Sequence, residues 1–348
     1  MKTKLLFAGV MAAMLFACSS EDNATGKDFT TKNEENTLAQ LQAQALQNLR
    51  QKFVFNADGQ EQVTLVSKKG VRINIVPSRL KLHGGPVHGP VIVEYIEIFD
   101  RGDMVTANKS TMGVYQGGVG QGDGLFAAAT AASDAQADQV LRPLRSGGEF
   151  FVNMKTEQGE NLDEGSEFNL QVPAQLTGEP QDDMQVWKGE ETADGDVKWT
   201  KDVDAAGNEK DAPLDGGGNY LMDMDSFGWC NIDQFWDFPG ETTLLWVDPP
   251  SNYDDSNSKV YAAFFYNQNS IARLDTYDWG LGMFKEHYGW VPVGLQCHII
   301  FVSGSGSNWV YATKTVTVTS NHPPIVIDPS EIVTATQADL INVLSGLQ

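Results

Sequence analysis

Apolar residues recur every three or four positions near both ends of the folded region, which is the spacing of an amphipathic helix. The first such segment covers residues 37–51. Its apolar residues are Leu38, Leu41, Ala45, Leu46 and Leu49. In the second segment Thr336 is a suitable N-cap, Asp339 follows three residues later and Gly346 ends the pattern. We therefore predict a short helix at each end.

Between these helices the apolar spacing changes to two, which is the period of a β-strand. In residues 71–75 Val71, Ile73 and Ile75 alternate with polar residues, and Pro77 ends the strand. We predict further strands at residues 91–99, 150–154, 168–172, 243–247, 259–266, 296–302 and 310–319. Short strands separated by turns are typical of sandwiches. The predicted fold class is all-β, with two β-sandwich domains, a short N-terminal helix and a short C-terminal helix.

Local composition divides the chain further. Residues 113–147 are rich in Gly and Ala, and residues 177–218 combine acids with glycines, so we predict loops there. The predicted organisation is a lipoprotein signal peptide at 1–17, a flexible tether at 18–33, an N-terminal β-sandwich at 34–178 with a Gly/Ala-rich insertion at 113–147, an acidic Gly-rich loop and linker at 179–218, and a C-terminal β-sandwich with its terminal helix at 219–348.

The first eighteen residues have the pattern of a bacterial lipoprotein signal. Lys2 and Lys4 precede an unbroken run of small or apolar residues over 5–17, which is too short to span a bilayer. Residues 15–18 (LFAC) resemble a lipobox, in which the Cys18 thiol takes diacylglycerol before cleavage. Acyl chains on Cys18 would insert into the lipid bilayer and anchor the chain stably.

The residues after Cys18 indicate a destination. Ser19 stands where an Asp would favour the inner membrane, so by resemblance to bacterial lipoproteins we expect the outer membrane. Residues 19–22 (SSED) resemble the acidic tract that sends lipoproteins of the Bacteroidota to the cell surface. We therefore expect an outer-membrane lipoprotein at the cell surface, with a periplasm-facing orientation as the alternative.

Charge excludes one class of partner. The 348 residues contain 24 Lys and Arg against 46 Asp and Glu, a formal net charge of −22. Nucleic acid is not expected as a partner, because phosphate contacts need clustered Lys and Arg. The hydrophobic share of 41% is ordinary for a folded chain with a sizeable core.

Several segments carry a resemblance to known proteins. They are residues 69–77 (KGVRINIVP), 89–91 (GPV), 94–104 (EYIEIFDRGDM), 145–150 (RSGGEF), 227–233 (FGWCNID) and 291–294 (VPVG). In this order they resemble a family of Bacteroidota lipoproteins that pair an N-terminal ZU5-like sandwich with a C-terminal carboxypeptidase-regulatory-like sandwich. The resemblance covers most of residues 35–348 and implies location and architecture. It implies no catalytic residues.

Catalytic motifs are absent from the sequence. No G-x-S-x-G segment occurs, and the glycines at 117–124 match no nucleotide-binding pattern. Residues 101–103 spell Arg-Gly-Asp, which we interpret as a tight turn between strands rather than an integrin-type motif. Paired carboxylates for glycoside hydrolysis are not identifiable, although acids are plentiful. We expect no enzyme, with a glycoside hydrolase as the least favoured alternative.

Metal sites are considered on two sets of residues. His83 and His88 lie in a predicted turn, and no motif supplies further zinc ligands. Calcium takes carboxylate and carbonyl oxygens, and the candidate ligands in the acidic segments are Asp202, Asp204, Asp223 and Asp225. Ala206 occupies a position where a calcium loop would carry an oxygen ligand. We therefore predict no metal and no cofactor, with calcium as the alternative.

Cysteines and aromatics leave alternatives open. Cys230 and Cys297 remain after lipidation of Cys18, and they permit either one disulfide or two buried free thiols. Five of the eight tryptophans neighbour acids, glycines or turns. These are Trp187, Trp199, Trp236, Trp279 and Trp290. We expect the aromatic residues to fill the sandwich cores, and the alternative is that some of these tryptophans lie on the surface and stack on sugars.

These observations favour a non-enzymatic binding or interaction module on the outer membrane. Its expected partner is a glycan or an envelope protein, bound by loops at the ends of the sandwiches. The alternative is a structural or assembly component of a cell-envelope complex, recognised through an apolar patch or an open sheet edge.

Overall fold

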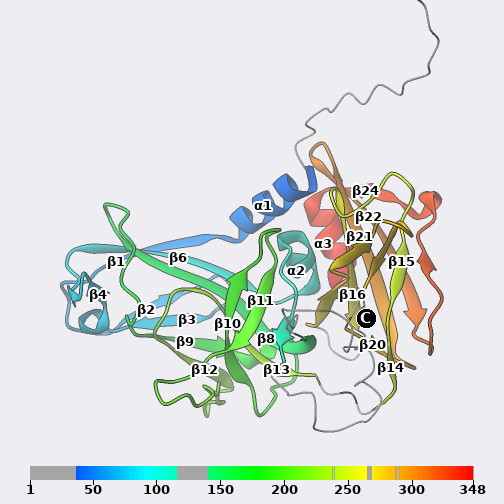
Figure 1. Cartoon of the computed structure of the whole chain (residues 1–348). Coiled ribbons are helices and arrows are strands. Elements are labelled where there is room, and N and C mark those ends of the chain that lie inside the picture. Colours follow the sequence, from blue (N-terminus) through cyan, green and yellow to red (C-terminus); the bar gives the residue numbers. More distant parts are fainter. Residues whose placement is uncertain are drawn as a thin grey trace, which may run out of the picture. The chain divides into compact units, whose positions relative to one another are not determined.

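The computed structural model describes residues 37–115, 140–236, 238, 240–264, 269–286, 288–289 and 291–347. The predictions for residues 1–17, for Cys18 and for the tether at 18–33 lie outside these residues, as do Trp290 and most of the Gly/Ala-rich insertion. The described chain is mostly β, which confirms the predicted class (Figure 1). None of its helices is long and apolar enough to cross a membrane.

The first half of the described chain builds a seven-stranded and a four-stranded sheet. In spatial order the larger sheet contains β1 (Gln51–Asn56), β6 (Pro90–Ile98), β8 (Leu141–Thr156), β13 (Gly228–Phe235), β10 (Gln185–Glu191), β11 (Val197–Lys201) and β7 (Met112–Val114). The smaller sheet contains β12 (Asn219–Met224), β9 (Phe168–Pro173), β3 (Arg72–Ile75) and β2 (Val63–Val66). A short hairpin of β4 (Lys81–Leu82) and β5 (Gly85–Pro86) follows β3.

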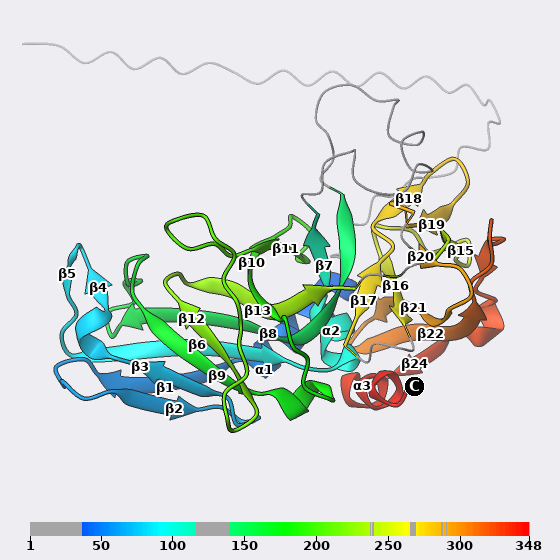
Figure 2. The ribbon, with the colours of Figure 1, turned by 90° about the horizontal axis from the view of Figure 1, so that it is seen from below.

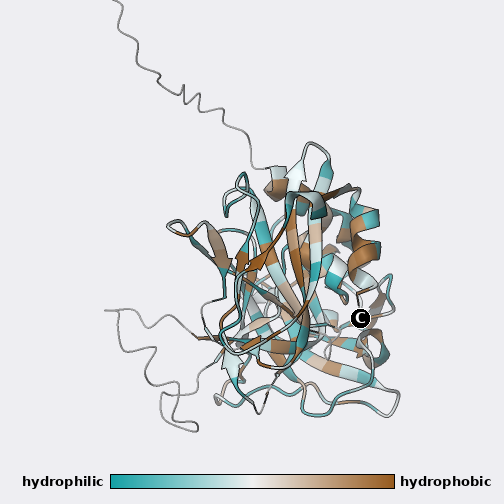
Figure 3. Cartoon of the chain, turned by 90° about the vertical axis from the view of Figure 1, so that its right-hand side faces the viewer, coloured by the Kyte–Doolittle hydropathy of each residue, from teal (hydrophilic) through white to brown (hydrophobic). Residues whose placement is uncertain are grey.

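One hydrophobic core contains side chains from both of these sheets. In β3 the side chains of Ile73 and Ile75 are fully buried, while Arg72 is exposed and Asn74 is half-buried. Hydrophobic and hydrophilic positions alternate in this way along several strands (Figure 3). The alternation therefore leaves the outer face of the four-stranded sheet polar.

The larger sheet curls back on itself. Strand β7 pairs with β11 in parallel and with the start of β8 in antiparallel, so that β8, β13, β10, β11 and β7 form a closed circuit. The pairing of β8 with β13 shifts register between Glu149 and Ser146, where Gly148 has a φ of +126° that is accessible to glycine. A Cβ atom there would lie 2.6 Å from the Phe99 ring. We call these five strands the strand circuit.

The second half builds a five-stranded and a four-stranded sheet (Figure 2). The larger contains β17 (Ile271–Arg273), β16 (Ser258–Phe264), β21 (Gln296–Ser305), β22 (Asn308–Thr317) and β24 (Val333–Ala335). The smaller contains β18 (Thr276–Asp278), β19 (Met283–Lys285), β15 (Trp246–Asp248) and β23 (Ile325–Val326). Strands β14 (Thr242–Thr243) and β20 (Val291–Pro292) pair separately. A second core contains side chains from both of these sheets.

Three α-helices lie together in the described chain: α1 (Thr37–Leu49), α2 (Arg101–Ala107) and α3 (Gln337–Ser345) (Figure 1). Helices α1 and α3 confirm both predicted helices, and Thr336 caps α3 by accepting from the Asp339 amide at 3.2 Å. Short 3-10 turns cover Pro77–Arg79, Ala174–Thr177 and Pro329–Glu331.

Helix α2 corrects the prediction for the Arg-Gly-Asp segment. Residues 101–103 are not a turn between strands but the first turn of α2, capped by the Asp100 carboxylate, which accepts from the Asp103 amide. Arg101 is only 3% exposed, and its guanidinium donates to the Leu347 carbonyl. The tripeptide is therefore part of the packing between α2 and the C-terminal helix.

Two predicted loops contain strands. The segment 179–218 includes β10 and β11, and β13, which we placed in the second sandwich, lies between β8 and β10 in the first sheet. The insertion at 113–147 begins in β7 and ends in β8. Acids and glycines occupy many exposed and turn positions in this segment, so the alternation of apolar and polar residues is weak. Trp187 and Trp199 are nevertheless fully buried. The acidic, Gly-rich composition therefore predicted a loop where the buried apolar residues of β10 and β11 form strands.

Candidate functional site

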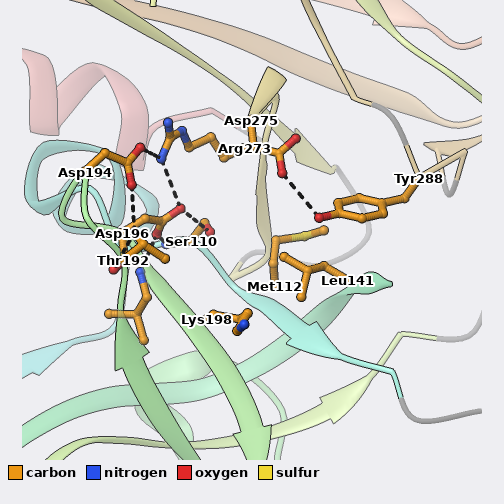
Figure 4. A pocket seen from close by; sticks show the side chains of 11 residues that line it. Ser110, Met112, Leu141, Thr192, Asp194, Asp196, Lys198, Arg273, Asp275 and Tyr288 are labelled. Carbon is orange, nitrogen blue, oxygen red and sulfur yellow. Dashed lines mark hydrogen bonds and ion pairs between the residues drawn. The ribbon is translucent and has the colours of Figure 1, made fainter. Parts of the chain in front are cut away.

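A pocket of about 220 Å³ lies where the turn between β10 and β11 meets β7 and β17 (Figure 4). Its lining residues are Ser110, Met112, Leu141, Thr192, Asp194, Asp196, Val197, Lys198, Arg273, Asp275 and Tyr288. Most of its polar side chains point toward one another in two groups. One group surrounds Arg273, and in the other the Tyr288 hydroxyl donates to Asp275 Oδ2 at 3.4 Å.

The first group is an ion-pair network. The Arg273 guanidinium pairs with Asp194 and lies 3.7 Å from Asp196 Oδ2. Asp196 Oδ1 accepts from the Ser110 and Val197 amides, each at 2.8 Å. Its Oδ2 accepts from the Ser110 hydroxyl at 2.9 Å. Both acidic side chains are therefore held by donors.

The electrostatics of the network follow from these contacts. Burial raises the pKa of Asp194, but the hydrogen bond and charge of Arg273 outweigh burial and hold this pKa well below its ordinary value. Burial and the Arg273 charge lower the pKa of the nearby Lys259 ammonium to about 8. Its Nζ donates to the Asp194 carbonyl at 3.0 Å.

This pocket is best explained as a joint between sheets. Asp194 and Asp196 belong to the turn of the first sheet, and Arg273 belongs to β17 of the five-stranded sheet. Charges that neutralise one another leave little affinity for an ionic ligand, because a ligand would first have to break the pairs. An ionic ligand is therefore not expected in this pocket.

A larger hollow of about 440 Å³ lies on the outer face of the four-stranded sheet, and we call it the sheet groove. Its lining residues are Gln62, Asn74, Val76, Arg79, Glu167, Phe168, Asn169, Lys210, Asp223, Met224 and Asp225. The lining thus combines amides, carboxylates and two cations with three apolar residues, Val76, Phe168 and Met224. The groove lies on β3, β9 and β12 and on the segments that flank them.

A row of polar side chains crosses the four-stranded sheet from strand to strand, and three of its four members line the sheet groove. Thr64, Asn74, Asn169 and Asp223 are aligned in register on β2, β3, β9 and β12. Thr64 Oγ1 donates to Asn74 Oδ1 at 2.8 Å, Asn74 Nδ2 donates to Asn169 Oδ1 at 3.3 Å, and Asn169 Nδ2 donates to Asp223 Oδ1 at 3.0 Å. We call these four residues the polar row.

Opposite charges border the polar row. Arg79 Nη1 lies 3.3 Å from Glu167 Oε2, and both side chains are more than half exposed. Lys210 Nζ lies 3.1 Å from Asp225 Oδ2. The exposed Arg79–Glu167 pair is weak and exchanges readily with solvent. Lys210, in contrast, is only 16% exposed and also pairs with the buried Asp202. The groove therefore offers hydrogen-bond donors and acceptors, and side chains of both charges, to a polar ligand.

The structure distributes the four calcium candidates over different roles. Asp202 is 2% exposed, and its carboxylate pairs with Lys188 at 2.9 Å and with Lys210 at 3.0 Å. Asp225 contacts the same two lysines. Their negative charge is thus neutralised by ammonium groups rather than left for a cation.

The other two candidates make local contacts. Asp204 Oδ1 accepts from the Ala206 and Asn208 amides at 2.8 and 2.9 Å, which closes a turn. Asp223 belongs to the polar row. In the described part of the chain no three His, Cys, Asp or Glu residues are grouped to hold a metal. The four candidates do not converge on a calcium ion.

Cys230 and Cys297 are buried and free, so the disulfide between them that the sequence left open is not formed. Cys230 belongs to the first core and Cys297 to the second. Burial raises the pKa of each thiol to about 12. Neither thiol is therefore a reactive nucleophile at neutral pH.

Aromatic residues are mainly core residues. Trp187, Trp199 and Trp309 are at most 1% exposed, and Trp236 is half-buried. Trp279, at the turn between β18 and β19, is 69% exposed. The described tryptophans therefore do not form a sugar-stacking cluster at one end of a sandwich.

The two histidines of the predicted turn contact different acids. His83 Nε2 lies 2.8 Å from Glu160 Oε1, and His88 Nδ1 lies 3.1 Å from Asp58 Oδ1. Both histidine side chains are about three-quarters exposed. Each histidine thus contacts a different acid on the surface, and the two do not share a site.

Comparison with known proteins found no matching family model, no matching curated protein and no matching solved structure. The resemblance to Bacteroidota lipoproteins therefore stays a prediction from the segments that carry it.

Sequence reasoning missed the polar row, although one signal for it was visible. In residues 72–75 and 168–173 three of the positions that alternate with buried apolar residues carry amides, namely Asn74, Asn169 and Gln171. That these amides align across strands depends on the register, which the sequence did not provide.

Proposed function

We propose that this chain is an outer-membrane lipoprotein, anchored through acylated Cys18 and facing the cell exterior, that acts as a non-enzymatic binding module. Its ligand site in this proposal is the sheet groove. We also infer that the two pairs of sheets are two β-sandwiches, because each pair shares a hydrophobic core.

The observation that carries the proposal is the polar row. Its four side chains lie in register across four strands, and Asn74, Asn169 and Asp223 line the larger of the two hollows described above. Because they bond to one another on an accessible face, a ligand can replace these hydrogen bonds at small net cost. An aligned polar surface of this kind suits recognition better than stability.

The chemistry of the groove suits a glycan. Asn74 and Asn169 each carry both donors and acceptors, and Asp223 accepts two hydrogen bonds or more, so that neighbouring sugar hydroxyls find complementary partners. Val76 and Met224 supply apolar contact for the carbon face of a sugar ring. A protein ligand, the other class expected from the sequence, would need a larger surface than this hollow.

The proposal assigns no catalytic step. In the pocket at β17, Asp194 and Asp196 are bound by donors, and Asp194 has a lowered pKa, which suits neither a general acid nor a shared proton. A glycosidase needs two carboxyls that reach the substrate from a cleft. In the groove, Asp225 pairs with lysines and Asp223 with an amide.

The test is glycan binding by matched asparagine variants. The purified chain is screened on a glycan array, and the affinity of the strongest ligand is measured by calorimetry for wild type, Asn169→Ala and Asn153→Ala. Asn153 is the control, because it lies in β8 and also bonds to another asparagine, Asn161, outside the groove. We expect about a tenfold weaker affinity for Asn169→Ala. Equal affinities of both variants and wild type would exclude the groove.

The anchor has a separate test. Protease treatment of intact cells is expected to digest the chain without lysis, while a periplasmic protein stays protected. Mass spectrometry of the N-terminal peptide is expected to find acyl chains on Cys18. Digestion only after lysis would show that the chain faces the periplasm and would contradict the cell-surface proposal. An unmodified Cys18 would contradict the proposed lipid anchor.

A component of an envelope complex is the second candidate, and one observation favours it. Trp279 and Leu281 are 69% and 60% exposed at the turn between β18 and β19. Large apolar side chains at such a tip are typical of protein contacts. A photo-crosslinking residue in place of Leu281 would give one discrete heavier species in intact cells under this candidate, and none under the glycan proposal.

A further inference from the structure

Three buried polar side chains lie together on one face of the strand circuit. Glu149 on β8, and Asn231 and Asp233 on β13, are each 0% exposed. In the strand register Asn231 lies opposite both Glu149 and Trp187. Asn231 Nδ2 donates to Asp233 Oδ2 at 2.8 Å, which links the two side chains of β13. We call Glu149, Asn231 and Asp233 the buried oxygen cluster.

The cluster is rich in acceptors and poor in donors. Both carboxylate oxygens of Glu149, Oδ1 of Asn231 and Oδ1 of Asp233 are buried and have no hydrogen-bond partner in the protein. Unpartnered buried acceptors are rare, because each has lost its water without compensation. The four oxygens therefore require an occupant: protons, water or a cation.

The nearby charged side chains do not supply hydrogen-bond partners for these four oxygens. The ammonium of Lys109 lies 4.9 Å from the Trp229 ring centre, pairs with Glu191 at 3.0 Å and donates to the Gly195 carbonyl. The Asp196 carboxylate adds negative charge near Glu149. The carboxylates of Glu149 and Asp233 together carry two negative charges when ionised, which matches a divalent ion.

We propose that Glu149, Asn231 and Asp233 form a buried site for a hard divalent cation of the calcium class. Carboxylate and amide oxygens are the ligands that calcium prefers, and backbone carbonyls or water complete its shell of six to eight oxygens. The site lies on β8 and β13 and shares no residue with the acidic segments considered from the sequence. It does not depend on the proposed glycan binding.

Protonation is the competing state of the same oxygens. Burial raises the pKa of Glu149 well above its ordinary value, the charges of Asp233 and Asp196 raise it further, and Lys109 opposes them. Burial likewise raises the pKa of Asp233 well above its ordinary value, although hydrogen bonds from Ser146, Gly147 and Asn231 oppose it. A cation must displace these protons, so its binding strengthens as pH rises.

The test combines metal content with stability. The full chain is unfolded and refolded in about 1 mM Ca²⁺ or in EDTA, because a sealed site fills as the protein folds. For wild type we expect one Ca²⁺ per chain by mass spectrometry and a melting temperature about 5 °C higher in Ca²⁺. For Glu149→Gln, which keeps the side-chain size, we expect neither.

Two controls make the outcome decisive. Asp204→Asn alters an exposed acid of the predicted calcium segment, and we expect it to retain both the bound ion and the shift. Asp233→Asn is a second cluster variant and is expected to lose both, should Glu149→Gln fail to fold. A wild type that refolds without Ca²⁺ and melts at the same temperature in both buffers would overturn the proposal, as would loss of the shift in Asp204→Asn alone.

Discussion

The sheet groove and the buried oxygen cluster use the same side-chain chemistry in opposite ways. In the groove, Asn169 bonds to Asn74 and Asp223 on a face that solvent reaches. In the cluster, Asn231 lies beside Glu149 and Asp233, all fully buried, and four acceptor oxygens have no partner in the protein. Register places an asparagine next to an acid in both regions, on adjacent strands.

The difference shows that accessibility decides what a polar group does. On an exposed sheet, hydrogen bonds exchange with water or ligand at little net free energy, so alignment serves recognition. In the interior the same groups must be satisfied or the fold loses stability. Polar groups inside this protein are therefore expected to control its stability, and those on the four-stranded sheet its binding.

The largest expected effect on stability is at Arg273, which joins the five-stranded sheet to the turn between β10 and β11. Arg273→Ala leaves the buried Asp196 carboxylate and its neighbour Asp194 without their guanidinium partner. We expect a loss of about 3–5 kcal/mol in the free energy of unfolding, measured by denaturant titration. A loss below about 1 kcal/mol would mean that the pair behaves as an exposed one.

The pH dependence of stability tests the effect of burial at Asp103, a carboxyl in the first turn of α2. Burial and the charge of Asp100 raise the pKa of Asp103 to about 7, although Lys69 opposes them. Because this pKa is raised in the folded state, the stability from Asp103 is complete below about pH 4 and is lost as pH rises toward about 7. Asp103→Asn should flatten the fall of melting temperature across this window.

Asp215 is the matched control for this pH experiment. Hydrogen bonds from the Asn219 amide and side chain lower the pKa of Asp215 to about 2. Its contribution is therefore present above about pH 4 and is lost as pH falls. Asp215→Asn should leave the slope between pH 4 and 7 unchanged, and an equal flattening in both variants would contradict the assignment to Asp103.

Paired asparagine variants compare the two regions directly. In EDTA, Asn231→Ala removes the donor to Asp233 in the interior, and we expect a loss of about 1–3 kcal/mol. Asn169→Ala removes bonds within the polar row, and we expect less than about 1 kcal/mol. Chemical denaturation of both variants checks the difference. Equal losses would show that exposure does not separate the regions.

The smallest expected effect is at the edge of the groove. Arg79 and Glu167 form a pair in which both side chains are more than half exposed. Arg79→Ala should change the free energy of unfolding by less than about 1 kcal/mol, with the effect disappearing in high salt. A larger, salt-independent loss would indicate a structural role for Arg79.

Regular spacing made part of the fold predictable. Helix α1 follows from the spacing of Leu38 to Leu49, helix α3 from Thr336 and Gly346, and β3 from alternating isoleucines. Strands β10 and β11 were missed because acids surround Trp187 and Trp199. In those segments tertiary burial of a few large side chains outweighed the loop-like composition.

The sites were less predictable than the fold, for a physical reason. The sequence pointed to Asp223 and Asp225, which do line the sheet groove, but for calcium chemistry that their contacts do not support. Glu149 stood in an apolar segment with no visible partner. Its neighbours Asn231 and Asp233 are about eighty positions away, and only the pairing of β8 with β13 brings them together.

Carboxyl footprinting with a bound glycan tests the central claim most directly. Acids are labelled with a carbodiimide and an amine, with and without the strongest glycan from the array, and each site is quantified by mass spectrometry. We expect the glycan to protect Asp223 and Glu167 in the sheet groove and to leave the labelling of Asp194 unchanged. Unchanged labelling of Asp223 and Glu167 with protection elsewhere would contradict the assignment of the groove as the binding site.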